Sequence, residues 1–242
     1  MTSASAGRLF ALVPAAGAGR RMNAGLPKQY LTLRGRALAE QTLHRLLAVG
    51  RIERVMVAVA ADDPWWPSLA VAGQARVATT TGGASRAESV RAGLAALAAE
   101  AGDGDRVLVH DMARPCVRPS DIEKLLAAGG EDGAILAQAS TDTLKQADAD
   151  GRITATLERA VIWRAQTPQL FSLGLLRRAL DEALQAGVDV TDEASAVERL
   201  GRRPLLVEGR SDNLKVTQPA DLALAEFYLT RQEEEGAGWG SV

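Results

Sequence analysis

The chain has 242 residues, of which 47% are hydrophobic and 24% charged, and its formal net charge is -2 at pH 7. This composition excludes a disordered chain, and the near-neutral balance supplies no global basic field for nucleic acid or an anionic membrane. The first residues are too short and too polar a run for a secretory signal, and no apolar run reaches the roughly 18 residues of a membrane span. We therefore expect a cytoplasmic protein that binds neither nucleic acid nor membrane, with any anion site confined to one locality.

The cysteine and histidine counts narrow the choice of metal site. The single cysteine, Cys116, allows neither an intrachain disulfide nor a cysteine-cluster metal site, as is typical of a reducing compartment. Two histidines, His44 and His110, exclude a multi-histidine zinc site.

Short apolar runs and segments of helical periodicity alternate along the chain, which predicts strands and helices in turn. Such an order predicts an α/β, Rossmann-like fold in one domain over 1–242, with a mostly parallel sheet and helices on both faces. The expected strands are 8–14, 54–60, 75–80, 106–111, 133–139 and 203–209. The expected helices are 38–50, 85–102, 119–130, 172–187, 191–201 and 218–232.

The segment 139–160 breaks this alternation. It contains two short alternating runs around Asp150-Gly151, a strong signal for a β-hairpin, with no helix between them. A lone two-stranded hairpin is marginally stable in water, so one that projects from an α/β domain is expected to pack against something else. We interpret 139–160 as a protruding β-arm that joins two subunits of a homodimer.

The first candidate site is the segment LVPAAGAGRRM, residues 12–22, at the end of the first strand. Ligands of open α/β sheets collect at the carboxyl ends of strands, and Gly17 and Gly19 would let backbone amides approach an anion closely. The segment matches neither the P-loop nor the three-glycine dinucleotide fingerprint. Taken alone, it is also compatible with a tight turn packed under the sheet.

Three cations surround this loop: Arg20, Arg21 and Lys28. Phosphoryl transfer needs such an arrangement, because fixed positive charge must offset the charge on the transferred phosphorus and the leaving group. The alternative for each residue is a solvated surface charge, which we accept for one of the two arginines.

The glycine turn after the third expected strand reads TTGGASRAESV. Ser85 is a plausible N-cap with Glu88 as its capping-box partner, and capping could be their whole role. Gly82 and Gly83 nevertheless lie where a flat base could rest against the backbone, with Ser89 in the first turns of the helix.

The fourth expected strand ends in HDMARPC. Asp111 is a reasonable single protein ligand for Mg²⁺, which keeps its waters and takes other ligands from phosphates. Arg114, three residues later, could meet an anionic substrate. We expect His110 to be a hydrogen-bonded structural residue rather than a base.

Four more candidates lie further along the chain. Thr143 and Arg159 stand at opposite ends of the expected hairpin, so strand pairing would bring them together around one phosphate. Lys215 follows the late strand 203–209, and Thr191 precedes a helix. Capping is the alternative role for the region around Thr191.

Seven motifs, in order, resemble those of the 2-C-methyl-D-erythritol 4-phosphate cytidylyltransferase family over residues 9–229. The resemblance implies an enzyme of non-mevalonate isoprenoid synthesis that joins CTP and methylerythritol phosphate into the cytidine diphosphate derivative and releases pyrophosphate. The matching segments are PAAGAGRRM, PKQYL, GGASRAESV, HDMARPC, AQTPQLF, TDEAS and GRSDNLKVT. Ala84 and Met112 depart from the usual pattern, which puts a side-chain contact to the nucleotide at Ala84 in doubt.

The resemblance also implies roles for individual residues. Arg21 and Lys28, with Lys215, would act on the transition state, and Asp111 would bind Mg²⁺, or Mn²⁺ in its place, on the ribose side. The acceptor would face Arg114, Thr191 and Lys215, while Thr143 and Arg159 would reach the substrate phosphate of the other subunit of a homodimer. The residues implied to touch CTP are Ala15, Ala16, Gly17, Gly83, Ser89 and Asp111.

The expected mechanism is a direct in-line attack of the acceptor phosphate on the α-phosphorus, which needs no general base. One alternative is a ribitol-phosphate cytidylyltransferase, whose members tend to open with LAGG rather than PAAG and to lack GRSDN before the lysine. Another is a nucleotide-binding module without catalysis, which would not need Arg21, Lys28 and Asp111 together. A Rossmann dehydrogenase is disfavoured by the missing third glycine and the lack of a clear ribose-binding acid.

Overall fold

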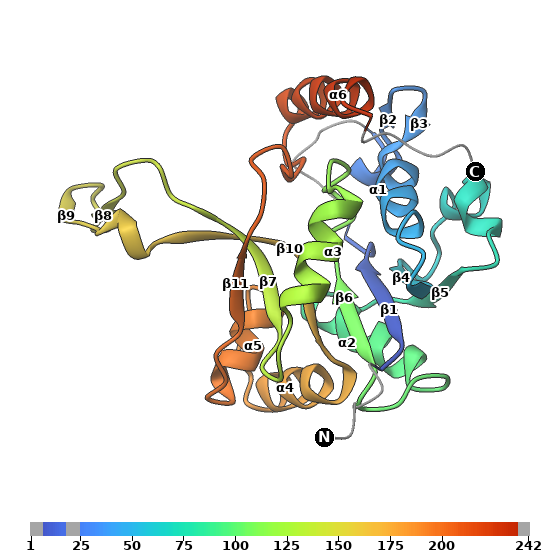
Figure 1. Ribbon diagram of the computed structural model, residues 1–242, viewed down its shortest axis with the longest axis horizontal. Coiled ribbons are helices and arrows are strands. Elements are labelled where there is room, and N and C mark those ends of the chain that lie inside the picture. The colour runs from blue at the N-terminus through green and yellow to red at the C-terminus, as the bar shows by residue number, and fades with distance from the viewer. Residues whose placement is uncertain (1–6, 18–24, 237–242) are drawn as a thin grey trace.

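A seven-stranded sheet forms the centre of the computed structural model, which describes residues 7–17 and 25–236 (Figure 1). Its strands are β1 (Leu9–Pro14), β4 (Ile52–Val59), β5 (Val77–Thr81), β6 (Arg106–Val109), β7 (Ala134–Ala139), β10 (Trp163–Ser172) and β11 (Leu205–Glu208). In space they follow the order β11-β7-β10-β6-β1-β4-β5. Only β10 runs antiparallel to its neighbours, so the predicted mostly parallel sheet is confirmed.

Helices cover both faces of this sheet, as predicted. They are α1 (Leu38–Leu47), α2 (Arg86–Leu97), α3 (Pro119–Ala128), α4 (Leu173–Gln185), α5 (Glu193–Arg199) and α6 (Pro219–Glu234). The side chains of β1 alternate between them: Phe10 and Leu12 pack with α2, α4 and α5, while Ala11 and Val13 pack with α1 and α3. Each of these four side chains is at most 1% exposed, so the continuous apolar run of β1 is explained by burial on both sides.

A third, smaller cluster fastens the last helix to the body. Leu229 of α6 packs with Leu33, Cys116 and Val216, all at most 2% exposed. Leu33 belongs to a small hairpin of β2 (Thr32–Leu33) and β3 (Arg36–Ala37), which the sequence analysis did not predict. Within the described residues, no helix combines the length and apolar character that crossing a membrane requires.

The antiparallel strand β10 was not predicted either. Its sequence WRAQTPQLFS carries two glutamines and Pro168, and proline removes a donor from the ladder. The structure accommodates Pro168 at an irregularity, because the pairing of β10 with β7 shifts register between Ala165 and Gln169. The irregularity forms a polar turn, Gln166–Gln169, which lies under the site described below. Each of its three polar side chains is at most 7% exposed.

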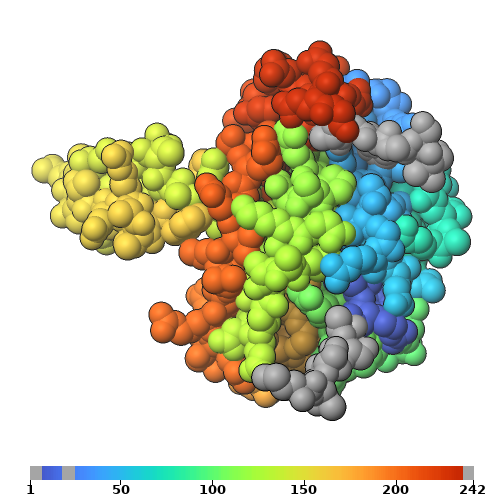
Figure 2. Space-filling model, in the orientation of Figure 1, coloured from blue at the N-terminus to red at the C-terminus, as the bar shows by residue number. Residues whose placement is uncertain are grey.

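The hairpin predicted around Asp150-Gly151 is confirmed. Strands β8 (Lys145–Ala147) and β9 (Ile153–Thr156) pair antiparallel, and Gly151 adopts a φ of +77°, which favours glycine at this turn. A short 3-10 helix, η5 (Arg159–Val161), follows. The arm stands away from the body in both views (Figure 1, Figure 2) and exposes apolar side chains, with Ile153 66% and Val161 70% accessible.

Candidate active site

A cavity of about 180 Å³ opens at the carboxyl ends of β1, β5 and β6. This is the edge of a parallel sheet at which ligands of open α/β folds bind. Eight residues singled out from the sequence line it: Ala15, Ala16, Gly17, Lys28, Gly83, Ser89, Asp111 and Lys215. Gly19, Arg20 and Arg21 lie outside the described residues, so the structure places neither the second glycine nor the arginine expected at this loop.

The loop after β1 is fixed from two sides. Ala15 N donates to the Ala58 carbonyl of β4 at 2.8 Å, which holds the start of the loop against the sheet. The Gln29 side chain is 5% exposed and donates through Nε2 to the Ala15 carbonyl at 3.0 Å. Gln29 belongs to the 3-10 turn η2 (Lys28–Tyr30), so the glycine loop and Lys28 are positioned together. The sequence analysis missed this role of Gln29.

Lys28 and Lys215 meet in the cavity although they lie at opposite ends of the sequence. Lys28 Nζ donates to the carbonyl of Val216, the residue after Lys215, at 3.1 Å. Val216 N in turn donates to the Ala113 carbonyl at 2.8 Å, which docks this segment beside the loop that carries Asp111. The two predicted lysines therefore converge beside the predicted carboxylate.

The second glycine turn forms the opposite wall. Helix α2 begins with the predicted capping box: Glu88 N donates to Ser85 Oγ at 3.1 Å, and Ser85 N donates to Glu88 Oε2 at 2.8 Å. Ser89 Oγ accepts from Gly83 N at 3.1 Å, so Ser89 fixes the turn. A Cβ at Gly83 would stand 2.3 Å from Glu88 Cβ, so only glycine fits there.

Asp111 is 7% exposed and has three cations around its carboxylate. Lys215 Nζ lies 2.9 Å from Oδ2, Arg86 Nε lies 3.1 Å from Oδ1, and Arg114 Nε lies 3.6 Å from Oδ2. Burial alone would raise the pKa of this carboxyl, but the charges of Arg86 and Lys215 outweigh burial and hold the pKa well below its usual range. Asp111 is therefore ionised throughout the physiological range.

His110 has the structural role expected from the sequence. It is 0% exposed, its Nε2 donates to the Arg114 carbonyl at 3.1 Å, and its Nδ1 accepts from Thr167 Oγ1 at 3.0 Å. Burial lowers the pKa of His110 to about 4, so the ring is neutral. Arg114, which the ring helps to hold, donates through Nη1 to the Asn213 carbonyl at 2.7 Å, and its guanidinium lies beside Asp111.

The buried turn of β10 fixes three segments of the site at once, a role that the sequence analysis missed. Thr167 Oγ1 accepts from Asp111 N at 2.9 Å, and the Thr167 carbonyl accepts from Asn213 Nδ2 at 2.9 Å. Gln169 Oε1 accepts from Ala194 N at 2.9 Å, which holds the start of α5. The motif AQTPQLF was visible in the sequence, but nothing there shows which segments it contacts.

Arg86 and Glu193 are the other residues that the sequence analysis missed. The Arg86 guanidinium forms a two-point ion pair with Glu193, with Nη1–Oε1 at 2.5 Å and Nη2–Oε2 at 2.9 Å, and Glu193 is 1% exposed. Burial would lower the pKa of Arg86, but the charges of Glu193 and Asp111 raise it overall, so Arg86 is charged. Burial also raises the pKa of Glu193, although Arg86 opposes the shift.

Four predicted residues of the described chain do not line the cavity. Arg114 is one of them, although its Nε lies 3.6 Å from Asp111 Oδ2. Thr191 is exposed and precedes Asp192, the N-cap of α5, whose side chain accepts from Ser195 N. Thr143 and Arg159 are exposed on the arm, on either side of the β8–β9 hairpin, where the Arg159 guanidinium donates to the Thr141 carbonyl at 3.1 Å. Within one chain the arm extends away from the body, so it does not bring these two residues to the cavity (Figure 1).

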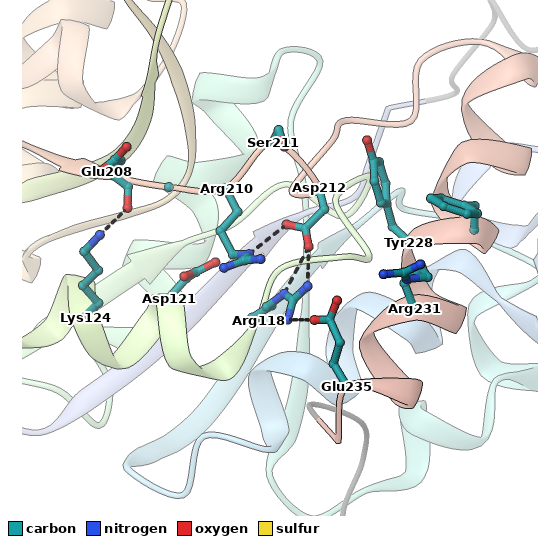
Figure 3. A pocket seen from close by; sticks show the side chains of 12 residues that line it. Arg118, Asp121, Lys124, Glu208, Arg210, Ser211, Asp212, Tyr228, Arg231 and Glu235 are labelled. Carbon is teal, nitrogen blue, oxygen red and sulfur yellow. Dashed lines mark hydrogen bonds and ion pairs between the residues drawn. The ribbon is translucent and has the colours of Figure 1, made fainter.

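A larger hollow of about 650 Å³ lies between α3, the loop after β11 and α6 (Figure 3). Its charged groups pair with one another: Arg118 lies 2.7 Å from Asp212 and 2.7 Å from Glu235. Lys124 donates to the Glu208 carbonyl at 2.7 Å. Four cationic side chains face four acidic ones in this hollow, so it offers a polyanion no excess of positive charge.

Comparison with known proteins shows the family of the chain. The family model described as 2-C-methyl-D-erythritol 4-phosphate cytidylyltransferase matches residues 9–231. A protein of that name from Ectopseudomonas mendocina (strain ymp) is 53% identical over 231 residues, covering 94% of this chain and 98% of the relative. A second, from Haemophilus influenzae (strain PittGG), is 50% identical over 225 residues, covering 93% of this chain and 98% of the relative.

Solved structures share the fold. A crystal structure named 4-diphosphocytidyl-2C-methyl-D-erythritol synthase superposes with a TM-score of 0.80 at 38% identity, covering 92% of this chain and 99% of the other. The Francisella tularensis 2-C-methyl-D-erythritol 4-phosphate cytidylyltransferase gives a TM-score of 0.80 at 33% identity, covering 92% and 100%. The similarity therefore spans nearly the whole of both chains.

Proposed function

Since the chain belongs to the 2-C-methyl-D-erythritol 4-phosphate cytidylyltransferase family, we propose that its cavity of about 180 Å³ is where CTP and the sugar phosphate react. The protein is a cytidylyltransferase of isoprenoid biosynthesis: it transfers CMP from CTP to 2-C-methyl-D-erythritol 4-phosphate and releases pyrophosphate. The observation that carries the proposed site is the convergence of Lys28, Lys215 and Asp111 between two glycine turns.

The nucleotide is assigned to the wall made by the two glycine turns. Ala15, Ala16 and Gly17 present backbone at the end of β1, and Gly83 presents backbone that Ser89 holds in place. Backbone amides of this kind suit phosphate oxygens, and close backbone approach suits a flat base. Asp111 is assigned to the ribose side of the same cavity.

The chemistry assigned to this site is one in-line displacement. An oxygen of the acceptor phosphate forms a bond to the α-phosphorus of CTP, and the bond from that phosphorus to the bridging oxygen of pyrophosphate breaks. The acceptor phosphate is already ionised near neutral pH, so no side chain has to remove a proton. Lys28 and Lys215 supply the positive charge that the reaction requires at the α-phosphorus, together with Arg21, which lies outside the described residues.

Mg²⁺, or Mn²⁺ in its place, is the proposed cofactor. Asp111 is the only acidic residue of the described chain that lines the cavity, and no group of three or more metal-ligating side chains exists among the described residues. One carboxylate fits an ion that takes its remaining ligands from phosphates and water. Both Asp111 oxygens are ion-paired here, but the Lys215 side chain is 41% exposed and can turn toward a phosphate. The bound ion would neutralise charge on the triphosphate.

The acceptor is assigned to Arg114, Thr191 and Lys215, and the protein is proposed to be a homodimer joined by the arm. Thr143 and Arg159 of one copy would then bind the sugar phosphate in the other copy. The exposed apolar side chains Ile153 and Val161 support a buried role for the arm in an assembly. A cytoplasmic location is proposed from the single cysteine, whose buried thiol has a pKa raised by burial to about 12.

Pyrophosphate release tests the function. Purified protein is incubated with Mg²⁺ and CTP, and methylerythritol phosphate or ribitol phosphate is added separately. We expect pyrophosphate release with methylerythritol phosphate and none with ribitol phosphate. Release only with ribitol phosphate would show that the protein uses this alternative acceptor. No release with either acceptor would contradict catalysis at this site.

A further inference from the structure

Arg86 connects two parts of the chain that lie far apart in sequence. It is the first residue of α2, at the nucleotide wall of the cavity, and it reaches Glu193, the first residue of α5, across 107 positions. Its Nη1 and Nη2 atoms both pair with Glu193, while its Nε atom pairs with Asp111 at 3.1 Å. All three donor nitrogens of one guanidinium are thus committed to two carboxylates.

Glu193 itself cannot touch a ligand, because only 1% of it is exposed. A buried carboxylate is costly unless it is paired and hydrogen-bonded, so its burial needs a functional or structural explanation. Its two oxygens meet the fork of the guanidinium, and this planar pairing fixes the orientation of the arginine as well as its position. With the fork held by Glu193, the remaining Nε–H faces Asp111.

We propose that Glu193 is a positioning residue for cytidylyl transfer, acting through Arg86 on Asp111. The order of contacts is Glu193 to Arg86, Arg86 to Asp111 Oδ1, and Asp111 Oδ2 to Lys215 Nζ at 2.9 Å. Arg86 therefore fixes Oδ1 of Asp111, and Oδ2 is left to orient Lys215 at the reacting phosphates. This inference rests on the proposed function of the same site.

The pair acts on the chemical step more than on CTP binding. CTP is assigned to the glycine turns, whose backbone contacts do not involve Glu193, and to Asp111 on the ribose side. The backbone of Asp111 is held by Thr167, which accepts from Asp111 N at 2.9 Å, so Asp111 stays in place without Glu193. Lys215, which Asp111 Oδ2 orients, faces the reacting groups. Loss of Glu193 therefore lowers kcat while the dissociation constant of CTP, measured by calorimetry without acceptor, stays that of the wild type. A residue needed only for folding would instead lower the melting temperature and CTP binding together.

The test compares Glu193→Gln with wild type. Gln keeps the volume but places an amide N–H₂ against the guanidinium, so we expect kcat to fall about 10- to 100-fold, the usual cost of losing the partner that orients a functional group. Arg86→Lys keeps the charge but cannot bridge both carboxylates, so it gives a similar loss. The double variant should lose no more than the larger single loss, because the two residues act as one unit.

Asp181→Asn is the matched control. Asp181 pairs with Arg91, another arginine of α2, at 2.5 Å on the surface, and we expect wild-type kcat and CTP affinity from this variant. Wild-type kcat in Glu193→Gln, or additive losses in the double variant, would overturn the proposal. So would a parallel loss of melting temperature and CTP binding. If Glu193→Gln does not fold, Arg86→Lys decides by the same kcat and CTP measurements. Wild-type protein that releases no pyrophosphate would instead refute the proposed function, and this inference with it.

Discussion

Two hollows of the molecule differ in their balance of charge, and the smaller of the two has the excess of positive charge. The larger one, of about 650 Å³, has as many acidic as cationic side chains, and these neutralise one another on α3, α6 and the loop between β11 and α6. Among the described residues, the smaller one, of about 180 Å³, has Lys28, Arg86 and Lys215 against Asp111 alone. Unbalanced charge beside glycine backbone therefore identifies the reaction site better than volume does. The first hollow should matter for stability and the second for turnover.

Arg118→Ala should give the largest effect, a decrease in the free energy of unfolding. Arg118 is 8% exposed and pairs with Asp212 and Glu235, so its removal leaves Asp212 buried without its main partner. Breaking such a pair costs about 3–5 kcal/mol in free energy of unfolding, and we expect the lower end because Arg210 remains 3.6 Å from Asp212. Denaturant unfolding measures the loss. A wild-type midpoint would contradict the assignment of this hollow to stability.

Lys28→Ala should lower turnover by about 100- to 1000-fold, the effect of losing about 2.7–4 kcal/mol of transition-state stabilisation. Steady-state pyrophosphate release measures the change, and circular dichroism checks that the fold is intact. Lys124→Ala in the larger hollow is the matched control, because that lysine donates to a backbone carbonyl away from the site. Equal turnover in both variants would remove the distinction between the two hollows.

His110 precedes Asp111, which lines the smaller hollow, and should make the stability of the protein sensitive to acid. Its pKa is lowered by burial from 6.5 to about 4, so the unfolded chain binds the proton more readily. The stabilisation is therefore complete above about pH 6.5 and is lost as the pH falls toward 4, by at most about 3 kcal/mol. Melting temperatures measured across this window should fall less steeply in His110→Gln than in wild type. Parallel pH curves would show that other groups dominate.

Arg159→Ala should give a smaller and more selective change. Arg159 is exposed on the arm, so its removal should leave the unfolding free energy unchanged and raise only the KM for the sugar phosphate. Mixed dimers with a Lys28→Ala partner test whether the residue acts across the interface. An unchanged KM would separate the arm from the reaction site.

The parts of the fold that the sequence predicts are those set by local pattern. Apolar runs such as the one in β1 predict strands, and the Asp150-Gly151 turn predicts the arm, because neighbouring residues decide both. Strand β10 escaped prediction because Pro168 and two glutamines contradict a strand pattern. Its place in the sheet is decided by partners elsewhere in the chain.

The same distinction holds at the site. Gly17, Gly83 and the Ser85–Glu88 capping box carry local signals, whereas Lys28 and Lys215 were paired only through the family resemblance. The ion pair of Arg86 with Glu193 has no local signal, since either residue alone looks like an ordinary charge near a helix start. The contacts of Thr167 and Gln169 likewise depend on tertiary packing.

The contact between Lys28 and Val216 decides when the site is completed during synthesis of the chain. It joins residues 188 positions apart, and the cluster beneath it includes Leu229 of the last helix. At a synthesis rate of about 5–20 residues per second, a growing polypeptide makes its glycine loop long before the segment that carries Lys215 exists. A chain arrested before that segment would hold most of its sheet without the second lysine. Reactivity toward CTP is thereby reserved for polypeptides that the ribosome has nearly finished.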